Sequence, residues 1–385
     1  QEHLKTMQIL HYCARLRLTD GGVVRAILDL TSALSESSKK VTLMVTEGND
    51  YPSPDSGIQI MRTGDFDRPP IRFSPKRLAL LKQHIADTDV LHLHIPWEPA
   101  NIQLAKIAIE VGTPYVISVH GMLDDWVMKK STMKKKLFLL LGGRKMFHKA
   151  SATHCTAIAE ANQVKRWIPK ANIQVVPLVF DPTNYLTPPP TSDPDKYWPQ
   201  RESEKPVILF LSRLHPKKGV DRLINAASEI VKKHDVRFII AGSGNPEYEI
   251  QLKELVQQLN LQSHIEFVGF VEGDRKTALL RTADLFVLPT SQENFGLALP
   301  EAMACSVPVI TTKGVDIWPE LQESGGALII EKDSNSVANA IAELLDNKER
   351  MRDMGLSGRA WVKETFSGDE VVNRYIKMYR ESINS

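Results

Sequence analysis

Residues 207–219 read VILFLSRLHPKKG and combine a strand, a turn and the start of a helix. The apolar run 207–211 predicts a strand buried on both faces, as in a parallel sheet that is covered by helices. The turn after it carries Arg213 and Lys218, and Gly219 opens a segment with helical periodicity. A cationic turn between the end of a buried strand and a helix N-terminus is typical of a loop that binds phosphate.

The same alternation of strands and helices continues in both directions along the chain. Downstream, we expect strands at 237–241, 265–268, 285–289 and 309–311, with helices at 247–259, 299–304 and 334–345. Upstream, we expect strands at 7–12, 41–45, 90–94, 115–119, 152–156 and 173–176, with helices at 23–34 and 100–111. Strands that alternate with helices predict an α/β fold with doubly wound parallel sheets.

The length of 385 residues and one polar segment indicate two domains. Residues 186–205 hold five prolines and seven charges without apolar periodicity, which is typical of a linker. This places one domain at residues 1–185, a second at residues 206–367 and a closing amphipathic helix, able to pack back on the first domain, at residues 368–385. Ligands of open α/β sheets bind beyond the carboxyl ends of the strands, so the site is expected in the crevice between the two domains.

Composition points to a folded, soluble protein of a reducing compartment. Hydrophobic residues make up 42% and charged residues 24%, and no apolar run approaches the length of about 20 residues that spans a bilayer. Cys13, Cys155 and Cys305 are far apart, which argues against a disulfide framework or a zinc site. We therefore expect a cytoplasmic protein.

The net charge of +2 hides an uneven distribution along the chain. Residues 1–185 carry 24 Lys and Arg against 17 Asp and Glu, whereas the remainder carries 24 against 29, so the two parts have net charges of about +7 and −5. A nucleic-acid-binding protein would normally be more basic than this. The asymmetry favours an anionic partner that binds on one side of the protein only.

A second motif, residues 293–301, reads ENFGLALPE and follows another predicted strand. Phe295, Gly296 and Leu297 can turn backbone N–H groups toward a ligand, because glycine permits the required turn. The carboxylates of Glu293 and Glu301 would repel phosphate, so we expect them to face hydroxyl groups, for which sugar hydroxyls are natural candidates.

The pattern SRLxxxKG followed by E-x7-E resembles the retaining glycosyltransferases of family 4, which have the GT-B fold of two Rossmann-like domains. The resemblance covers nearly the whole chain and includes the Gly21–Gly22 turn, VHG at 119–121 and AGSG at 241–244. It implies transfer of a sugar from a nucleotide diphosphate sugar, with retention of configuration, to a polysaccharide, oligosaccharide or lipid-linked acceptor.

The resemblance also implies roles for individual positions. Arg213 and Lys218 would neutralise the diphosphate, Glu293 would hold hydroxyls of the donor sugar, and His120 would sit over that sugar. A single histidine after a strand is also commonly structural, and this alternative stays open. The remaining implied donor contacts are Glu301 to the ribose, Gly21 and Gly22 to the phosphates, Phe295, Gly296 and Leu297 through their backbone, and Gly269, Phe270 and Val271 against the base.

No metal or other cofactor is expected. Asp124 and Asp125 are adjacent but lie in the first domain after the VHG turn, and no other acidic pair is placed to hold a divalent ion. Arginine and lysine can instead compensate the charge that develops on the departing diphosphate.

Between Trp126 and Ala159 the sequence contains no acidic residue, and residues 126–149 combine eight lysines and arginines with aromatic and leucine side chains. The membrane-facing or acceptor-facing residues expected here are Trp126, Lys129, Lys130, Lys134, Lys135 and Lys136. Cations combined with aromatic and leucine side chains can bind an anionic membrane from its cytoplasmic side. An anionic soluble acceptor, or a core helix with a solvated basic face around 137–141, would fit the same pattern.

Two other functions fit the sequence besides a glycosyltransferase of surface polysaccharide or glycolipid assembly. One is a catalytically silent partner protein that binds nucleotide sugar or membrane, and the other is a sugar-nucleotide epimerase of the same architecture. The four charged residues of the two motifs favour an active transferase over a silent protein, and an epimerase would need no acceptor.

Overall fold

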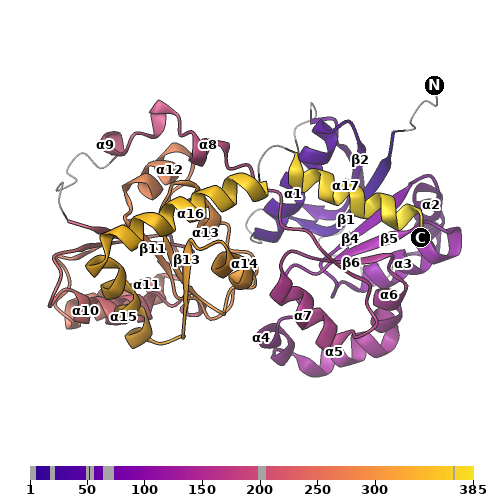
Figure 1. The fold of residues 1–385 in the computed structure, drawn as a ribbon. Helices are drawn as coiled ribbons and strands as arrows, with labels where there is room; N and C mark the ends of the chain where they lie inside the picture. Colours follow the sequence, from indigo (N-terminus) through magenta and orange to yellow (C-terminus); the bar gives the residue numbers. More distant parts are fainter. Residues whose placement is uncertain are drawn as a thin grey trace. The chain divides into compact units, whose positions relative to one another are not determined.

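The chain divides into two compact units in the computed structural model (Figure 1). Unit 1 comprises Gln1–Phe180 and Asp369–Ser385, and unit 2 comprises Asp181–Gly368. The structure describes residues 6–17, 22–48, 52, 56–63, 73–197, 205–366 and 369–385.

Unit 1 is built on a seven-stranded, all-parallel sheet with the order β3-β2-β1-β4-β5-β6-β7. The strands are β1 (Gln8–Leu16), β2 (Lys40–Gly48), β3 (Gln59–Arg62), β4 (Val90–His94), β5 (Tyr115–Ser118), β6 (Ala152–Cys155) and β7 (Ile173–Val175). The helices are α1 (Gly22–Glu36), α2 (Pro75–Ala86), α3 (Pro99–Val111), α4 (Asp125–Lys129), α5 (Thr132–Phe138), α6 (Arg144–Lys149), α7 (Ile158–Trp167) and α17 (Glu370–Ile383), with a π-helical turn at Leu139–Gly143.

Unit 2 contains a six-stranded parallel sheet with the order β10-β9-β8-β11-β12-β13. The strands are β8 (Val207–Leu211), β9 (Arg237–Ala241), β10 (Ile265–Gly269), β11 (Leu285–Leu288), β12 (Val309–Thr312) and β13 (Ala327–Ile330). The helices are α8 (Thr183–Leu186), α9 (Pro194–Tyr197), α10 (Val220–Ile230), α11 (Pro246–Gln258), α12 (Gly273–Thr282), α13 (Ala298–Ala304), α14 (Trp318–Glu323), α15 (Ser334–Asp346) and α16 (Lys348–Phe366).

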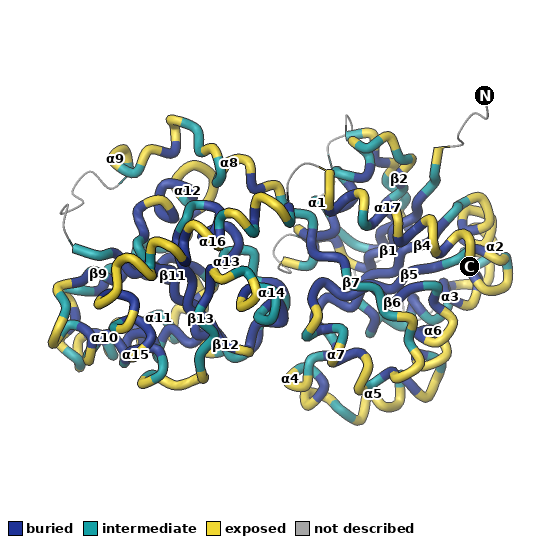
Figure 2. The backbone as a smooth tube through the Cα atoms, in the orientation of Figure 1, coloured by how far each residue is buried: buried dark blue, intermediate teal, exposed yellow. Residues whose placement is uncertain are grey.

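The predicted α/β class with two doubly wound parallel sheets is confirmed. Strands β8 and β11 are buried along their whole length, as their unbroken apolar sequences predict, and Figure 2 shows the same buried centre in both units. In each sheet the strand order reverses beside the first strand, between β1 and β4 in unit 1 and between β8 and β11 in unit 2. Loops that leave such a switch point diverge and leave room for a ligand.

The segment expected to be a linker belongs to unit 2 as far as the structure describes it. The change of unit falls at Asp181, and the carbonyls of Leu186 and Ser192 accept hydrogen bonds from Arg359 at 2.5 Å and Arg281 at 2.9 Å. Proline lacks a backbone donor, but the carbonyls of a proline-rich segment remain good acceptors for arginine. Composition therefore did not reveal that this stretch packs on α12 and α16.

Helix α17 packs on unit 1 over a layer of buried polar side chains. The hydroxyl of Tyr379 lies 2.7 Å from Nδ1 of His92, and Nε2 of His92 lies 2.6 Å from Ser118 Oγ. Ser118 Oγ lies 2.6 Å from Nδ1 of His154, whose Nε2 donates to the carbonyl of Val176 at 2.8 Å. Because a carbonyl only accepts, this end fixes the direction of every hydrogen bond in the chain from Tyr379 to Val176.

Burial keeps five histidines of unit 1 neutral, namely His11, His92, His94, His120 and His154. It lowers the pKa of His11 and of His120 to about 3 and that of His154 to about 4. Burial also lowers the pKa of His92 and His94 well below the usual value, and neighbouring histidines add to the effect.

The stability of unit 1 should therefore fall as the pH is lowered through 6.5. In the unfolded chain these histidines bind protons below that pH, whereas the folded chain does not bind them until about pH 3–4. Each such histidine costs about 1.4 kcal/mol per pH unit over this window. We expect His154→Gln to reduce the loss of unfolding free energy between pH 7.5 and 5.5 by about this amount in urea titrations.

His84→Gln is the matched control, because His84 is exposed on α2 of the same unit. This variant should keep the pH dependence of the wild type. Equal pH dependence in the His154 and His84 variants would contradict the interpretation.

Candidate functional site

The two sequence motifs of unit 2 meet at its switch point. Lys218 lies in the loop after β8 and Glu293 in the loop after β11, and the two side chains form an ion pair. The Lys218 side chain is 3% exposed and that of Glu293 is 24% exposed. Solvent therefore hardly reaches the Lys218 ammonium, whereas it reaches part of the Glu293 side chain.

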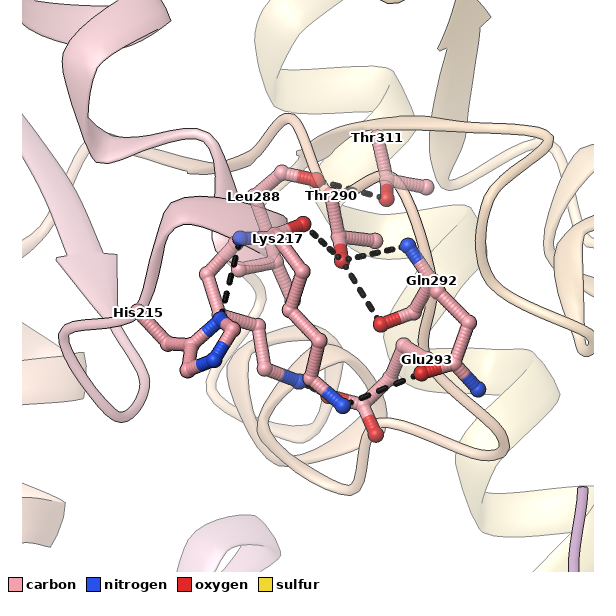
Figure 3. A network of polar contacts seen from close by, with 8 residues as sticks. His215, Lys217, Leu288, Thr290, Gln292, Glu293 and Thr311 are labelled. Atoms are coloured by element: carbon pink, nitrogen blue, oxygen red, sulfur yellow. Dashed lines mark hydrogen bonds and ion pairs between the residues drawn. The ribbon is translucent and has the colours of Figure 1, made fainter. Parts of the chain in front are cut away.

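Backbone contacts hold these two loops together (Figure 3). The carbonyl of Lys217 accepts hydrogen bonds from the backbone N–H of Ser291 at 2.6 Å and from Thr290 Oγ1 at 3.1 Å. Gly219 has a φ of 75°, and a Cβ atom there would lie 2.2 Å from the carbonyl oxygen of Pro289. Only glycine permits this approach, so the end of the first motif fits closely against the start of the second loop.

Side chains extend the network around Thr290, which is fully buried. Its hydroxyl lies 3.2 Å from the carbonyl oxygen of Gln292 and 3.3 Å from the backbone nitrogen of the same residue. Lys217 Nζ donates to Gln292 Oε1 at 3.0 Å, and the backbone N–H of Lys217 donates to His215 Nδ1 at 3.1 Å (Figure 3). These contacts fix the backbone on both sides of Lys218 and Glu293.

Lys218 is an unusual cation because it is buried beside other cations. Burial lowers its pKa to about 7, and the positive charges of Lys217 and Arg213 add to this effect. The Glu293 carboxylate acts in the opposite direction and favours the ammonium form. An anion that entered this site would likewise favour the protonated lysine.

Arg213 differs from Lys218 because its side chain is exposed and has no bonding partner among the described residues. Its side chain makes no hydrogen bond or ion pair with any other described residue. The sequence placed Arg213 and Lys218 in one phosphate site, and the structure places both in the loop that begins after β8. Arg213 is thus free to bind a ligand, whereas Lys218 already holds a carboxylate.

Glu301 has a neighbour that the sequence did not indicate. Its carboxylate forms an ion pair with Lys276 of α12 at 2.6 Å and accepts a hydrogen bond from the hydroxyl of Tyr185 at 3.1 Å. Lys276 lies twenty-five positions upstream, and no motif connects the two residues. Only the packing of α12 beside α13 could reveal this pair.

The residues between the two glutamates have mixed roles. Phe295 is 2% exposed and packs against Phe366 of α16, so its side chain belongs to the core. Gly296 has a φ of 67° and Leu297 precedes α13. The backbone N–H groups of residues 295–297 donate no hydrogen bond to any described residue, and the expected ligand contact through them remains a prediction.

The turn after β10 was expected to lie against the base of the nucleotide. Gly269 has a φ of 73°, and its carbonyl accepts a hydrogen bond from Gly242 at 2.8 Å. The Phe270 side chain is 64% exposed, whereas that of Val271 is 5% exposed. Any contact made by Val271 would therefore come from its backbone.

In unit 1 donor contacts were expected at Gly21, Gly22 and His120. Gly21 is outside the described residues, and Gly22 begins α1 with nothing within 4 Å of a Cβ atom added there. His120 follows β5, is 7% exposed and has a φ of 52°. Its Nε2 lies 3.0 Å from Nδ1 of His94, so the ring is held from one side.

The structure adds two observations on metal ligands. Asp124 caps α4 through the backbone N–H of Trp126, and Asp125 forms an ion pair with Arg166 at 2.8 Å, so each carboxylate has another contact. One group of three described residues, His11, His92 and His94, brings nitrogen atoms within 4.8 Å of one another. Both ring nitrogens of His92 and of His94 already lie in hydrogen bonds.

The basic apolar segment, residues 126–149, is largely exposed. Five large apolar side chains are exposed along it, with fractions of 49% to 82%: Trp126, Met133, Leu137, Leu140 and Leu141. Leu139 is buried, so only one of these leucines packs in the core as the alternative interpretation required. Among the described helices, none is both long and apolar enough to cross a bilayer.

Lys135 departs from the expectation for this segment. Its ammonium donates to the carbonyls of Val127 and Lys130, the latter at 2.8 Å, and its pKa is lowered by burial. Lys135 therefore ties α5 to α4 and does not point outward with its neighbours. Lys129, Lys130, Lys134 and Lys136 are exposed.

Family models match most of the chain. The model described as Glycosyltransferase Family 4 matches residues 20–184, and the model described as Glycosyl transferases group 1 matches residues 195–361. The first match begins after β1 and lies almost entirely in unit 1, and the second lies in unit 2.

Curated relatives match across both units. The chain is 30% identical over 294 residues to N-acetyl-alpha-D-glucosaminyl L-malate synthase of Bacillus anthracis, covering 76% of this chain and 74% of that protein. It is 28% identical over 345 residues to phosphatidyl-myo-inositol mannosyltransferase of Mycolicibacterium smegmatis, covering 86% of this chain and 82% of that protein.

Solved structures support the fold. Sucrose-phosphate synthase from Thermosynechococcus elongatus has a TM-score of 0.77 at 19% identity and covers 97% of this chain and 98% of its own. Anabaena HepE in complex with UDP has a TM-score of 0.76 at 18% identity and covers 97% of this chain and 99% of its own. Together with the two family models, these similarities show that the chain belongs to glycosyltransferase family 4 and has the GT-B fold.

Proposed function

We propose that unit 2 binds a nucleotide diphosphate sugar and that the protein transfers the sugar with retention of configuration and without a metal ion. The acceptor would be a polysaccharide, an oligosaccharide or a lipid-linked sugar. The observation that carries this proposal is the buried Lys218 beside the exposed, uncommitted Arg213 at the switch point of unit 2. Two cations at the carboxyl end of a parallel sheet form a site for a diphosphate.

The charges of the site suit the chemistry of transfer. When the bond between sugar and phosphate breaks, negative charge accumulates on the departing diphosphate, and cations already in place stabilise it. Bound phosphate would favour the ammonium form of Lys218, whose pKa lies at about 7 without a ligand. In exchange, the Glu293 carboxylate would leave Lys218 and accept hydrogen bonds from sugar hydroxyls.

The relatives support the class of donor without fixing its base. One solved relative is described in complex with UDP-glucose, and one curated relative is named as GDP-mannose-dependent. Both are nucleotide diphosphate sugars, which is the class that Arg213 and Lys218 would bind. A thermal-shift panel of UDP, GDP and ADP sugars would identify the preferred donor, because a ligand at about 100 times its dissociation constant stabilises by about 2.7 kcal/mol.

Glu293→Gln should abolish most transfer while the protein stays folded, with a stability lowered by the loss of the ion pair to the buried Lys218. The amide keeps the shape of the side chain but loses the charge that would strengthen hydrogen bonds to the sugar hydroxyls. We expect the transfer rate to fall about 100-fold or more, as for other preorganised transition-state contacts. The measurement is turnover of the preferred donor together with thermal unfolding.

Glu323→Gln serves as the control, because Glu323 is an exposed carboxylate at the end of α14 in the same unit. It should transfer sugar like the wild type. Unchanged turnover in the Glu293 variant would overturn the proposed role. Consumption of donor at the same rate without any acceptor would favour an epimerase or a hydrolase over a transferase.

Arg213→Ala should weaken binding of the nucleotide diphosphate without affecting stability. Arg213 has no partner among the described residues, so its removal leaves no buried group unpaired. Loss of a hydrogen bond to a charged group costs about 2 kcal/mol, which corresponds to about thirtyfold in dissociation constant. Calorimetric titration with UDP and GDP measures it, and Lys253→Ala on the exposed side of α11 is the control. Equal affinities in the two variants would remove Arg213 from the site.

We also propose that the basic apolar segment binds an anionic membrane surface and so brings the enzyme to a lipid-linked acceptor. Helix α5 buries none of its residues, and the adjoining Leu140 and Leu141 are 82% and 69% exposed. Side chains of this kind insert into the headgroup region, while each nearby lysine or arginine adds about 1 kcal/mol on an anionic surface. The exposed cations of the segment are Lys129, Lys130, Lys134, Lys136, Arg144, Lys145 and Lys149.

Leu140→Asp with Leu141→Asp should strongly reduce sedimentation with vesicles of phosphatidylglycerol and phosphatidylcholine. Leu80→Asp is the matched control, because Leu80 is 53% exposed on α2 of the same unit but lies outside the segment. Binding of the wild type should weaken with salt. Equal binding to vesicles of phosphatidylcholine alone would contradict the electrostatic part of the proposal, and equal binding of both variants would contradict the location.

A further inference from the structure

His120 is the end of a chain of three buried imidazole rings in unit 1. Nδ1 of His11 lies 3.0 Å from Nε2 of His94, and Nδ1 of His94 lies 3.0 Å from Nε2 of His120. In both pairs the ring centroids are 5.3 Å apart. This separation of 5.3 Å equals the nitrogen–nitrogen distance of 3.0 Å plus the distance from each ring centre to its own nitrogen. The two ring centres and the two nitrogens therefore lie nearly on one line, and the rings meet edge to edge, as hydrogen bonds require.

A neutral imidazole carries one N–H donor and one acceptor nitrogen, so this chain has only two possible directions. In the first, His120 donates from Nε2, His94 donates from Nε2 to His11, and His11 is left with a proton on its own Nε2. In the second, His11 donates from Nδ1, His94 donates from Nδ1, and His120 is left with its proton on Nδ1. In the first direction Nδ1 of His120 is a hydrogen-bond acceptor, and in the second it is a hydrogen-bond donor.

The far end of the chain decides between these directions. Nε2 of His11 is buried and has no hydrogen-bond partner among the described residues. In the first direction this atom would be a buried N–H group without an acceptor, which is rare in folded proteins. In the second it is a lone pair without a donor, which is tolerated more often. The structure therefore favours the second direction.

We propose that His11 and His94 hold His120 in the Nδ1–H tautomer, so that His120 presents a hydrogen-bond donor at the open end of the chain. Nδ1 of His120 makes no hydrogen bond with any described residue. His94 and His11 are positioning residues, because they act through His120. This inference rests on the proposed function, and the acceptor of that hydrogen bond would be an oxygen atom of a bound substrate.

The backbone around His120 is fixed as well. Glu160 is fully buried, and its carboxylate accepts hydrogen bonds from the backbone N–H groups of Gly121 and Thr156. This anchors the turn in which His120 adopts a φ of 52°. A donor of fixed direction on a fixed backbone cannot serve as a proton acceptor, so the tautomer assigns the base of the reaction to another group.

The direct test is the protonation of the His120 ring. In protein labelled with ¹⁵N-histidine at pH 7.5, the spectrum that correlates ring nitrogens with ring protons reports which nitrogen carries the hydrogen. His120→Gln identifies the His120 signals by their loss. We expect a protonated Nδ1 and a bare Nε2 in the wild type, and a protonated Nε2 would overturn the proposal.

Variants test whether the other two histidines impose this state. His94→Phe and His11→Phe break the chain, and we expect the His120 signals to change to a mixture of tautomers. His154→Gln is the matched control, because His154 is equally buried in the same sheet but lies in the separate chain of Ser118 and Tyr379. It should leave the His120 signals unchanged. Unchanged His120 signals in both phenylalanine variants would overturn the positioning role.

Kinetics separates this proposal from the proposed function. Breaking the chain should lower kcat about tenfold and leave the KM for the donor unchanged, because Arg213 and Lys218 are untouched. The spectrum does not depend on transfer. A protein with the Nδ1–H tautomer at His120 but without transferase activity would overturn the proposed function alone. An active enzyme with the Nε2–H tautomer at His120 would overturn this inference alone.

Discussion

The buried ammonium of Lys218 is the constraint on which the candidate donor site depends. A cation that is 3% exposed must have an anion beside it, because an unpaired buried charge costs several kcal/mol. In the absence of a ligand, Glu293 supplies this anion across the switch point of unit 2. In the proposed function a diphosphate would take its place, and the released carboxylate would then be available for hydroxyl groups. The two motifs that the sequence separates meet in this ion pair.

The proposed exchange would require the two loops to keep a fixed distance. The close approach of Gly219 to the Pro289 carbonyl and the contacts of Lys217 with the backbone beyond β11 provide this. Arg222 adds to it by donating to Pro289 O at 2.7 Å and to Ser291 Oγ at 2.6 Å. With the backbone held in this way, only side chains would need to move in the proposed exchange, and little of the binding energy would be lost to reorganisation.

The sequence predicted the central strands because each is a continuous apolar run, and it singled out Lys218 and Glu293, although not their pairing, because they lie in compact motifs. It missed β3, which is short and has polar residues at both ends, and α16, where buried glycines such as Gly355 and Gly358 replace an apolar stripe. It also missed the partner of Glu301, since Lys276 becomes a neighbour only through the packing of α12. Local patterns predict elements and loops, whereas pairs that form across the fold require the structure.

The two units hold polar groups in opposite electrostatic states. Unit 2 pairs a buried cation with a carboxylate. Unit 1 buries five histidines whose pKa values are all lowered, so that its hydrogen bonds run between neutral groups with a fixed direction. A paired charge of the first kind changes when a charged ligand binds, whereas neutral donors and acceptors select a partner by the direction of their hydrogen bonds.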